Sequence, residues 1–427
     1  MTVCEKFAVN SRQKLLMPVV MLGALFEGFD FMVINQALPL IAQDLGLDTR
    51  TTGFVISLIA IGAILAFFVV RLADKYGRRP IFLLSVVSYA LCSLATAFVS
   101  SVFFFILFQL LGRIFLVACW GVGYIIMAEE FPASMRGRAV GIFQAGAAIG
   151  GILPALCMTL GVGWRGLFAL GAIPLVILLF THKNLPETEH FLETQNALKE
   201  EDTLRPCFLA IFDQPYRKSI ITMMGLWFCM YLCYATTMSF FAFRVVTELR
   251  WDTKTQVGPV LLVAALFGLL GYYAVGKALD SWGRKKTAIV FFSCGAIAAI
   301  FVFKCTSFVS VLTANVIANF FIGTFTVLCA TFSSELFPTA LRGTAYAWGN
   351  NVMGRLATIA APTAASLLAA PLQGIGNAVA LLATGGLLCA LIVAFFLPET
   401  MNLKVPEYAC RQTSFDGSLT CQIVHKD

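Results

Sequence analysis

Long apolar runs dominate this chain, and they limit its possible folds more than any other feature. About twelve of them, each near the roughly 20 residues that a helix needs to cross a bilayer, follow one another along the sequence. Charged residues make up only 12% of the chain, whereas soluble domains carry about 25%. A soluble fold would therefore have a core with too little polar surface to cover it. The sequence predicts an all-α membrane protein with twelve transmembrane helices.

The predicted helices fall into two sets of six. The first set covers residues 16–39, 53–72, 80–99, 102–128, 138–160 and 164–180, and the second covers 219–243, 257–279, 287–303, 308–332, 343–369 and 376–397. Between the sets, residues 182–218 are polar and contain three prolines. We therefore predict an N-terminal six-helix bundle (1–181), a cytoplasmic linker (182–218), a C-terminal six-helix bundle (219–400) and a cytoplasmic tail (401–427).

Two charged motifs occur twice in the chain. A charged loop between two apolar runs, Arg71–Arg79, recurs as Gly276–Lys286. The pattern Glu-x-x-Pro-x-x-x-Arg-Gly begins at Glu129 and again at Glu335. Asp280 stands 206 positions after Asp74, and Glu335 stands 206 positions after Glu129; repetition of both motifs at one spacing indicates two related halves. Each half also ends in Leu-Pro-Glu-Thr, at 185–188 and at 397–400.

The basic residues indicate how the chain is oriented. Most of the 30 Lys and Arg residues fall in loops on one side of the predicted helices, and such an excess marks the cytoplasmic side. Both termini and both motif loops are thus predicted to be cytoplasmic, in a protein of the inner cell membrane. The net charge of +7 does not indicate a nucleic-acid partner, because it reflects this loop asymmetry.

Several other functions find no support in the sequence. The cysteines lie mostly inside apolar runs, without the spacing of a zinc site or redox pair. No phosphate-binding loop is present. The first apolar run carries Glu27 and Asp30 without a small-residue cleavage site, so we expect a retained helix instead of a signal peptide. We predict no metal, no cofactor and no enzymatic activity.

The repeated motifs resemble those of the major facilitator superfamily. That family carries a loop of the form G-x-L-A-D-x-x-G-R-R between its second and third helices, and Asp74, Gly77, Arg78 and Arg79 match it here. The first glycine of the pattern is replaced by Val70 in the first copy and is present in the second. The resemblance covers nearly the whole chain. It implies two six-helix halves around a central site, working by alternating access.

The charges of the two motifs suggest a cytoplasmic gate. Arg78 can pair with Glu129 or Asp74, and the second copy offers the same partners. A carboxylate at a helix end is favoured by a neighbouring helix N-terminus, and a network that closes one face is a bistable element. The alternative is that these charges only anchor loops. The predicted gate residues are Asp74, Gly77, Arg78, Arg79, Glu129, Arg136, Asp280, Gly283, Arg284, Glu335 and Arg342.

Two carboxylates inside the first helix suggest proton coupling. Glu27 and Asp30 are three residues apart and so share one helical face. Ionised side chains at mid-membrane cost roughly 2.5–3.5 kcal/mol each and commonly serve as proton relays. The segment resembles the Asp-Gly-x-Asp of aromatic acid:proton symporters, with Glu27 in place of the first Asp. Neighbouring helices that simply satisfy both carboxylates are the alternative.

Two intramembrane arginines suggest an anionic substrate. Arg113 has Trp120 on its face of the fourth helix, and Trp348, Asn351 and Arg355 form one stripe of the eleventh. A guanidinium with an amide and an indole suits an aromatic or unsaturated carboxylate. An internal ion pair for Arg355 is equally open. The predicted substrate site comprises Arg113, Trp120, Tyr231, Tyr234, Trp348, Asn351 and Arg355.

Together these features predict a secondary active transporter that takes up a small organic acid with a proton. Its partners would be that solute, the proton and the bilayer, and we expect a monomer. Three alternatives stay open: a sugar or polyol porter, a drug or metabolite exporter, and a sensor that has a transporter fold but no flux.

Overall fold

The computed structural model describes residues 11–131, 133–181, 187–188, 211–212, 216–337, 339–401, 409–411 and 422–424. Nearly all of these residues are helical, and the short strands β1 (Ala409–Arg411) and β2 (Gln422–Val424) pair antiparallel near the C-terminus. Eleven helical stretches of the described chain are long and apolar enough to cross a membrane. The predicted class, an all-α membrane protein, is confirmed.

Contacts divide the chain into two units. Unit 1 comprises Met1–Glu200 with Ser239–Leu262, and unit 2 comprises Glu201–Met238 with Val263–Asp427. Most of the predicted linker (182–218) and tail (401–427) lies outside the described residues. The predicted domain boundaries therefore remain a prediction.

Helices of unit 1 correspond closely to the first six predicted spans. They are α1 (Ser11–Asp44), α2 (Thr49–Ala60), α3 (Gly62–Tyr76), α4 (Arg78–Ala97), α5 (Val102–Glu130), α6 (Ala133–Thr159), α7 (Trp164–Leu170) and α8 (Ile173–Thr181). The predicted sixth span is thus two short helices. Pro174 explains the break, because proline has no N–H to donate to the carbonyl oxygen of Leu170, four residues earlier, and its ring crowds that carbonyl.

Unit 2 repeats this order with more interruptions. Its elements are α11 (Arg217–Thr247), η3 (Thr253–Val257), α12 (Gly258–Trp282), α13 (Arg284–Lys304), α14 (Phe308–Ile322), α15 (Phe325–Glu335), α16 (Thr339–Tyr346), η4 (Ala347–Gly354), α17 (Arg355–Ala369), α18 (Ile375–Ala383) and α19 (Gly385–Phe396). The ends of α11 and η3 with the start of α12 belong to unit 1 by their contacts. Two elements, η3 and η4, are π-helices, which occur often at functional sites.

Large apolar side chains are exposed along the helices. Phe68 is 65% exposed and Phe395 is 78% exposed. Extended apolar surface of this kind is unfavourable in water, and a lipid environment satisfies it.

The repeated glycines of the charged motifs have a structural reason. Gly77 and Gly283 each join two helices as the only residue between them, α3 to α4 and α12 to α13. Their φ angles are 103° and 89°, in a region that side chains other than glycine rarely adopt. One positive-φ residue thus turns the chain from one helix directly into the next.

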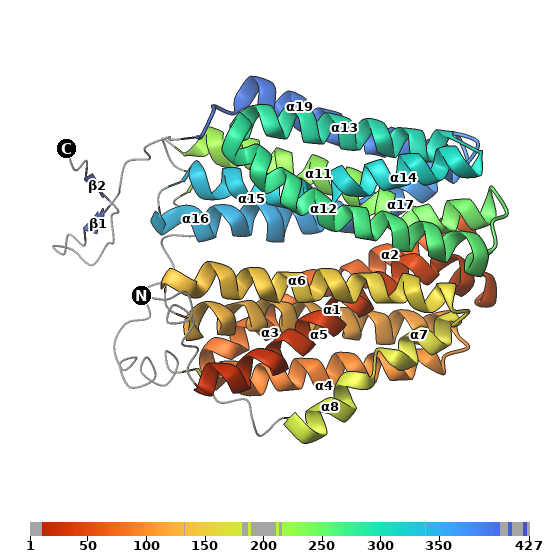
Figure 1. Ribbon diagram of the computed structural model, residues 1–427, viewed down its shortest axis with the longest axis horizontal. Helices are drawn as coiled ribbons and strands as arrows, with labels where there is room; N and C mark the ends of the chain where they lie inside the picture. Colours follow the sequence, from red (N-terminus) through yellow and green to blue (C-terminus); the bar gives the residue numbers. More distant parts are fainter. Residues whose placement is uncertain are drawn as a thin grey trace, which may run out of the picture. The chain divides into compact units, whose positions relative to one another are not determined.

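Glycines also allow α1 and α6 to touch backbone to backbone, and Figure 1 shows these helices running side by side. A Cβ atom added to Gly28 would collide with the carbonyl oxygen of Ala147, and one added to Gly150 would collide with that of Leu25. Gly28 lies two residues before Asp30. This contact therefore fixes the part of α1 that carries the intramembrane carboxylates.

We expect Gly150→Ala to lower the free energy of unfolding by about 1–3 kcal/mol, because the added methyl group meets backbone that cannot move aside. Gly141→Ala on the same helix is the matched control, since nothing lies within 4 Å of its added Cβ atom. Thermal unfolding of both variants in detergent checks this. Equal melting temperatures for the two variants would contradict the close contact of α1 with α6.

Candidate functional site

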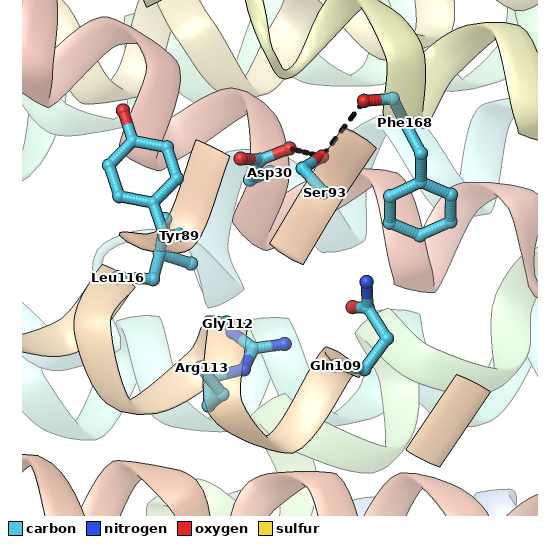
Figure 2. A pocket seen from close by; sticks show the side chains of 8 residues that line it. All are labelled: Asp30, Tyr89, Ser93, Gln109, Gly112, Arg113, Leu116 and Phe168. Atoms are coloured by element: carbon cyan, nitrogen blue, oxygen red, sulfur yellow. Dashed lines mark hydrogen bonds between the residues drawn. The ribbon is translucent and has the colours of Figure 1, made fainter. Parts of the chain in front are cut away.

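Unit 1 contains a small polar cavity between α1, α4, α5 and α7 (Figure 2). It has about 20 Å³ of space for the centre of a water molecule, and a polar cavity with such space can hold ordered water. The cavity therefore suits water better than an organic solute. Its lining residues are Asp30, Tyr89, Ser93, Gln109, Gly112, Arg113, Leu116 and Phe168.

Asp30 is held at the cavity by α4 and by the end of α7. Its Oδ1 atom accepts a hydrogen bond from the Ser93 hydroxyl at 3.0 Å, and that hydroxyl also lies 2.9 Å from the carbonyl oxygen of Phe168. Gly171 leaves room for this arrangement, because a Cβ atom there would collide with the Asp30 carboxylate. The break between α7 and α8 thus packs directly on the carboxylate.

Arg113 and Gln109, both from α5, lie across the cavity from Asp30 and Ser93 (Figure 2). The guanidinium carbon of Arg113 lies 4.7 Å from the ring centre of Phe31, a cation–π distance. Gln109 donates to the Thr96 hydroxyl at 2.9 Å. A cation and a carboxyl group therefore share one small cavity.

The two remaining residues predicted for this region lie outside the cavity lining. Glu27 is half-buried one turn before Asp30 on α1, and the two carboxylates interact electrostatically. Trp120 packs against Phe143 of α6, with ring centres 4.7 Å apart. Of the proposed substrate residues in unit 1, the structure thus brings Arg113 to Asp30, while Trp120 packs between helices.

Unit 2 contains an aromatic–amide cluster formed by Trp227, Tyr231, Tyr346, Asn350 and Asn351. The Tyr231 hydroxyl donates to Asn350 Oδ1 at 2.8 Å, and Asn350 Nδ2 donates to Tyr346 and to Asn351, each at 3.1 Å. The rings of Trp227 and Tyr231 are nearly parallel, with centres 6.0 Å apart. The cluster joins aromatic faces to a network of amide and hydroxyl groups.

The π-helix η4 makes this cluster possible. Added Cβ atoms at Gly349 and Gly354 would collide with the rings of Trp227 and Tyr231, so both rings pack on backbone. Arg355 directly follows η4, is half-buried and interacts electrostatically with Tyr231.

The other predicted residues of unit 2 lie around the cluster. The Tyr234 ring stands edge-on to that of Tyr231, with centres 6.1 Å apart. Trp348 packs edge-on against Phe212, with centres 4.9 Å apart. Asn351 is exposed and joins the cluster through Asn350.

Each unit also holds a cluster of charged groups at the repeated motifs. In unit 1, the first loop cluster consists of Arg78, Glu129, Glu187 and Thr188. Arg78 Nη2 lies 3.1 Å from Glu129 Oε1, and the Thr188 hydroxyl donates to Glu129 at 2.9 Å. Glu187 accepts the backbone N–H groups of Arg78 at 2.8 Å and of Arg79 at 3.2 Å. A carboxylate thereby covers the N-terminus of α4, where it is favoured.

The second loop cluster, Arg284, Glu335, Glu399 and Thr400, repeats these contacts in unit 2. Arg284 Nε lies 3.0 Å from Glu335 Oε1, and Thr400 donates to Glu335. Glu399 accepts the backbone N–H groups of Arg284 at 2.8 Å and Lys285 at 3.1 Å. Burial would raise the pKa of Glu399, but the N–H donors of Met401, Arg284 and Lys285 outweigh it and lower that pKa.

Some predicted gate residues lie elsewhere in the motifs. Asp280 is 82% exposed and lies 3.6 Å from Arg284. Arg342 is exposed and donates to the carbonyl oxygen of Phe337 at 3.1 Å; among the described side chains no ion pair joins it to Glu335. The side chains of Asp74 and Arg136 lie outside the described residues.

The sequence of this chain matches the model of a known protein family. The family model of the Major Facilitator Superfamily matches residues 20–362. The chain belongs to the Major Facilitator Superfamily. It is accordingly a multi-pass membrane transporter of small molecules and not an enzyme.

Relatives within the superfamily transport metabolites. The niacin transporter NiaP of Acinetobacter baylyi is 23% identical over 388 residues, covering 84% of this chain and 88% of that protein. The cis,cis-muconate transport protein of the same organism is 28% identical over 405 residues, covering 88% and 92%. Among solved structures, the xylose transporter XylE from E. coli has a TM-score of 0.70 at 20% identity, covering 90% and 96%. The resemblance to metabolite and aromatic acid transporters is confirmed.

Sequence reasoning missed three groups of residues in this superfamily member. Glu187 and Glu399 stand in the repeated Leu-Pro-Glu-Thr segments, so their repetition was the available signal. Asn350 adjoins the predicted Asn351 but reaches the cluster only because η4 is a π-helix. Tyr89 and Ser93 are two of several polar residues in one apolar run, and nothing in the sequence separates them from packing residues.

We expect Glu399→Gln to lower stability near pH 7, because the charged carboxylate interacts with the helix N-terminus by roughly 0.3–1 kcal/mol. The lowered pKa means that wild type loses this contribution as pH falls below the ordinary glutamate value of about 4.3. The stability difference between wild type and Glu399→Gln should therefore shrink towards low pH. Thermal unfolding from pH 7 to pH 3 measures it.

Asp280→Asn is the control for this series, because Asp280 is 82% exposed and should change stability little at either pH. A constant difference between wild type and Glu399→Gln across the range would contradict the assignment.

Proposed function

We propose that this transporter takes up a small organic acid together with a proton by alternating access. The observation that carries the proposal is the Asp30 carboxyl group, held opposite Arg113 in a cavity of water size. Ionisable groups on membrane-spanning helices are costly, by roughly 2.5–3.5 kcal/mol for each charge, and commonly mark a proton or ion pathway. Organic solutes are too large for this cavity, so we assign it to the proton.

Asp30 has neighbours that suit both of its protonation states. The Ser93 hydroxyl has one hydrogen and lies within reach of both Asp30 Oδ1 and the Phe168 carbonyl oxygen. When Asp30 is charged, Ser93 donates to it. When Asp30 is protonated, its own O–H donates to the Ser93 oxygen, which turns its hydrogen to Phe168. Arg113 across the cavity favours the charged form, and we therefore assign Arg113 to proton release instead of substrate binding.

The aromatic–amide cluster and Arg355 are our candidate for the substrate site. A guanidinium pairs with carboxylates in a planar fork, and neighbouring aromatic faces favour an unsaturated ring or chain. The names of two relatives, a niacin transporter and a cis,cis-muconate transport protein, fit this class of solute. We propose an aromatic or unsaturated carboxylate as substrate, held by Arg355, Tyr231 and Asn350, with Tyr234, Trp348 and Asn351 at its periphery.

The two loop clusters are proposed to gate the cytoplasmic side. Each combines an interhelical ion pair with a carboxylate at a helix N-terminus, so opening must break several contacts together. Their basic loops also support the proposed orientation, with both termini in the cytoplasm of a monomer in the inner membrane. In this proposal Asp280 and Arg342 add charge to the loops, and Glu129 and Glu335 are the acidic partners in the interhelical ion pairs.

Reconstituted vesicles test the proposal against its rivals. With an acidic exterior, we expect accumulation of nicotinate or cis,cis-muconate and none of xylose. Preferential uptake of xylose would indicate a sugar porter. Proton-driven movement out of the compartment would indicate an exporter. An absence of counterflow for any bound ligand would indicate a sensor.

We expect Asp30→Asn to abolish accumulation driven by the pH gradient while sparing exchange, because the amide cannot carry a proton but keeps the shape of the carboxyl group. The measurement is uptake of the accepted acid with and without a gradient, beside counterflow. Undiminished accumulation in Asp30→Asn would refute the proton-carrier role.

We expect Arg355→Lys to weaken binding of the accepted acid by about tenfold or more, because lysine cannot form the planar two-point contact of a guanidinium. Arg50→Lys, at an exposed position on α2, is the matched control. Isothermal titration with purified protein measures both variants. Unchanged affinity in Arg355→Lys would move the anion site elsewhere.

A further inference from the structure

Tyr89 is a buried polar residue that the proposed mechanism does not use. It lies on α4 one turn before Ser93, and it is 1% exposed. Its hydroxyl has no hydrogen-bond partner among the described residues, although tyrosine hydroxyls usually find one when buried. Tyr89 lines the same cavity as Asp30 and Arg113.

One of the two carboxylate oxygens of Asp30 also lacks a hydrogen-bond partner among the described residues. Oδ1 accepts the Ser93 hydrogen bond, while Oδ2 is buried without a hydrogen-bond partner in the described part of the chain. Figure 2 shows Oδ2 on the side of Asp30 that faces Tyr89. Among the described residues, a donor and an acceptor without hydrogen-bond partners thus belong to two side chains that line one cavity. The cavity's 20 Å³ of space for a water centre allows one water to reach both.

We propose that this cavity binds an ordered water molecule that links the Tyr89 hydroxyl to Asp30 Oδ2, and that Tyr89 thereby acts as a positioning residue for proton binding at Asp30. The inference rests on the proposed role of Asp30 as the proton carrier. In this chain Tyr89 donates to the water, and the water donates to the carboxylate. Such a link satisfies two buried polar groups that would otherwise each cost free energy.

Other groups also act on Asp30, and Tyr89 has to be separated from them. Within the described residues, the titratable and charged groups that face it are Glu27 from α1, Tyr89 and Cys92 from α4, and Arg113 from α5. All except Tyr89 act on the carboxylate through charge or burial. Of these groups, the tyrosine is assigned as the O–H donor towards Oδ2. Its removal should move the midpoint in the same direction as loss of the Arg113 charge would, but Tyr89→Phe leaves every charged group in place.

Donation to Oδ2 stabilises the charged carboxylate relative to the protonated acid. Tyr89→Phe removes the first donor of the chain and keeps the shape of the ring. Asp30 in the variant should therefore hold its proton to higher pH. Since a hydrogen bond contributes about 0.5–1.5 kcal/mol, the expected change is roughly two- to twelvefold tighter proton binding. Folding should be spared, because the lost hydroxyl makes no hydrogen bond to any residue that the structure describes.

Infrared titration of the full-length protein in lipid tests the inference without any organic substrate. The carbonyl-stretch band of protonated Asp30 is assigned by its loss in Asp30→Asn, and its midpoint is then followed in wild type, Tyr89→Phe and Tyr124→Phe. Tyr124 lies on α5, is 43% exposed and does not line the cavity. We expect the midpoint to move to higher pH in Tyr89→Phe alone.

Gly112→Ala tests the water separately. Gly112 lines the cavity, and its added Cβ atom meets only the Cβ atom of Cys92, at 3.3 Å. The methyl group should displace the water with Tyr89 in place, moving the midpoint in the same direction. The double variant Tyr89→Phe/Gly112→Ala should shift no further than either single one, because both remove the same link.

Three results would count against the inference. A midpoint in Tyr89→Phe equal to that of Tyr124→Phe would overturn it while leaving the proposed transport untouched. A shift in Tyr89→Phe with none in Gly112→Ala would remove the bridging water. A wild-type protein in which Asp30 does not titrate would refute this inference and the proposed proton carrier together.

Discussion

A charge placed inside a bilayer needs compensation from its neighbours, and the core of unit 1 is arranged around that requirement. Asp30 lies where α1 approaches α6 through glycines, where α4 offers a hydroxyl, and where α7 ends. The insertion cost of a carboxylate, roughly 2.5–3.5 kcal/mol, is a large part of the 5–15 kcal/mol that separates a typical folded domain from its unfolded chain. Each of these contacts reduces that cost, and together they keep the carboxyl group away from bulk water without excluding a proton.

A second constraint acts at the ends of the helices. In both units a single glycine joins two helices, which brings the first N–H groups of the following helix to the surface of the unit. Glu187 and Glu399 cover those groups, and Arg78 and Arg284 pair with glutamates of a third helix. Three segments distant in sequence are thereby joined at each motif, so the doubled pattern is a structural unit rather than a set of independent surface ion pairs.

Much of this could be predicted from the sequence, since apolar length and repeated charges are strong signals. The membrane spans, the duplicated motifs and the intramembrane charges Asp30 and Arg113 can all be recognised from the sequence alone. The interruptions of the helices cannot. A stripe drawn with a period of 3.6 residues selects Asn351, whereas the wider turn of η4 brings Asn350 to Tyr231. A role for Tyr89 can be recognised only from the cavity, because side chains of several helices form it together.

A comparison of the two repeated halves indicates why the proton site is proposed for unit 1 alone. Between the two repeated motifs the register is fixed, so each residue of α4 and α5 has a counterpart 206 positions later. The counterparts of Tyr89, Ser93 and Arg113 are Gly295, Ala299 and Asn319. A Cβ atom at Gly295 would meet the ring of Phe325 at 2.6 Å, so an aromatic side chain fills that part of unit 2. The contacts at the helix ends are thus the same in both units, whereas the polar groups between those ends differ.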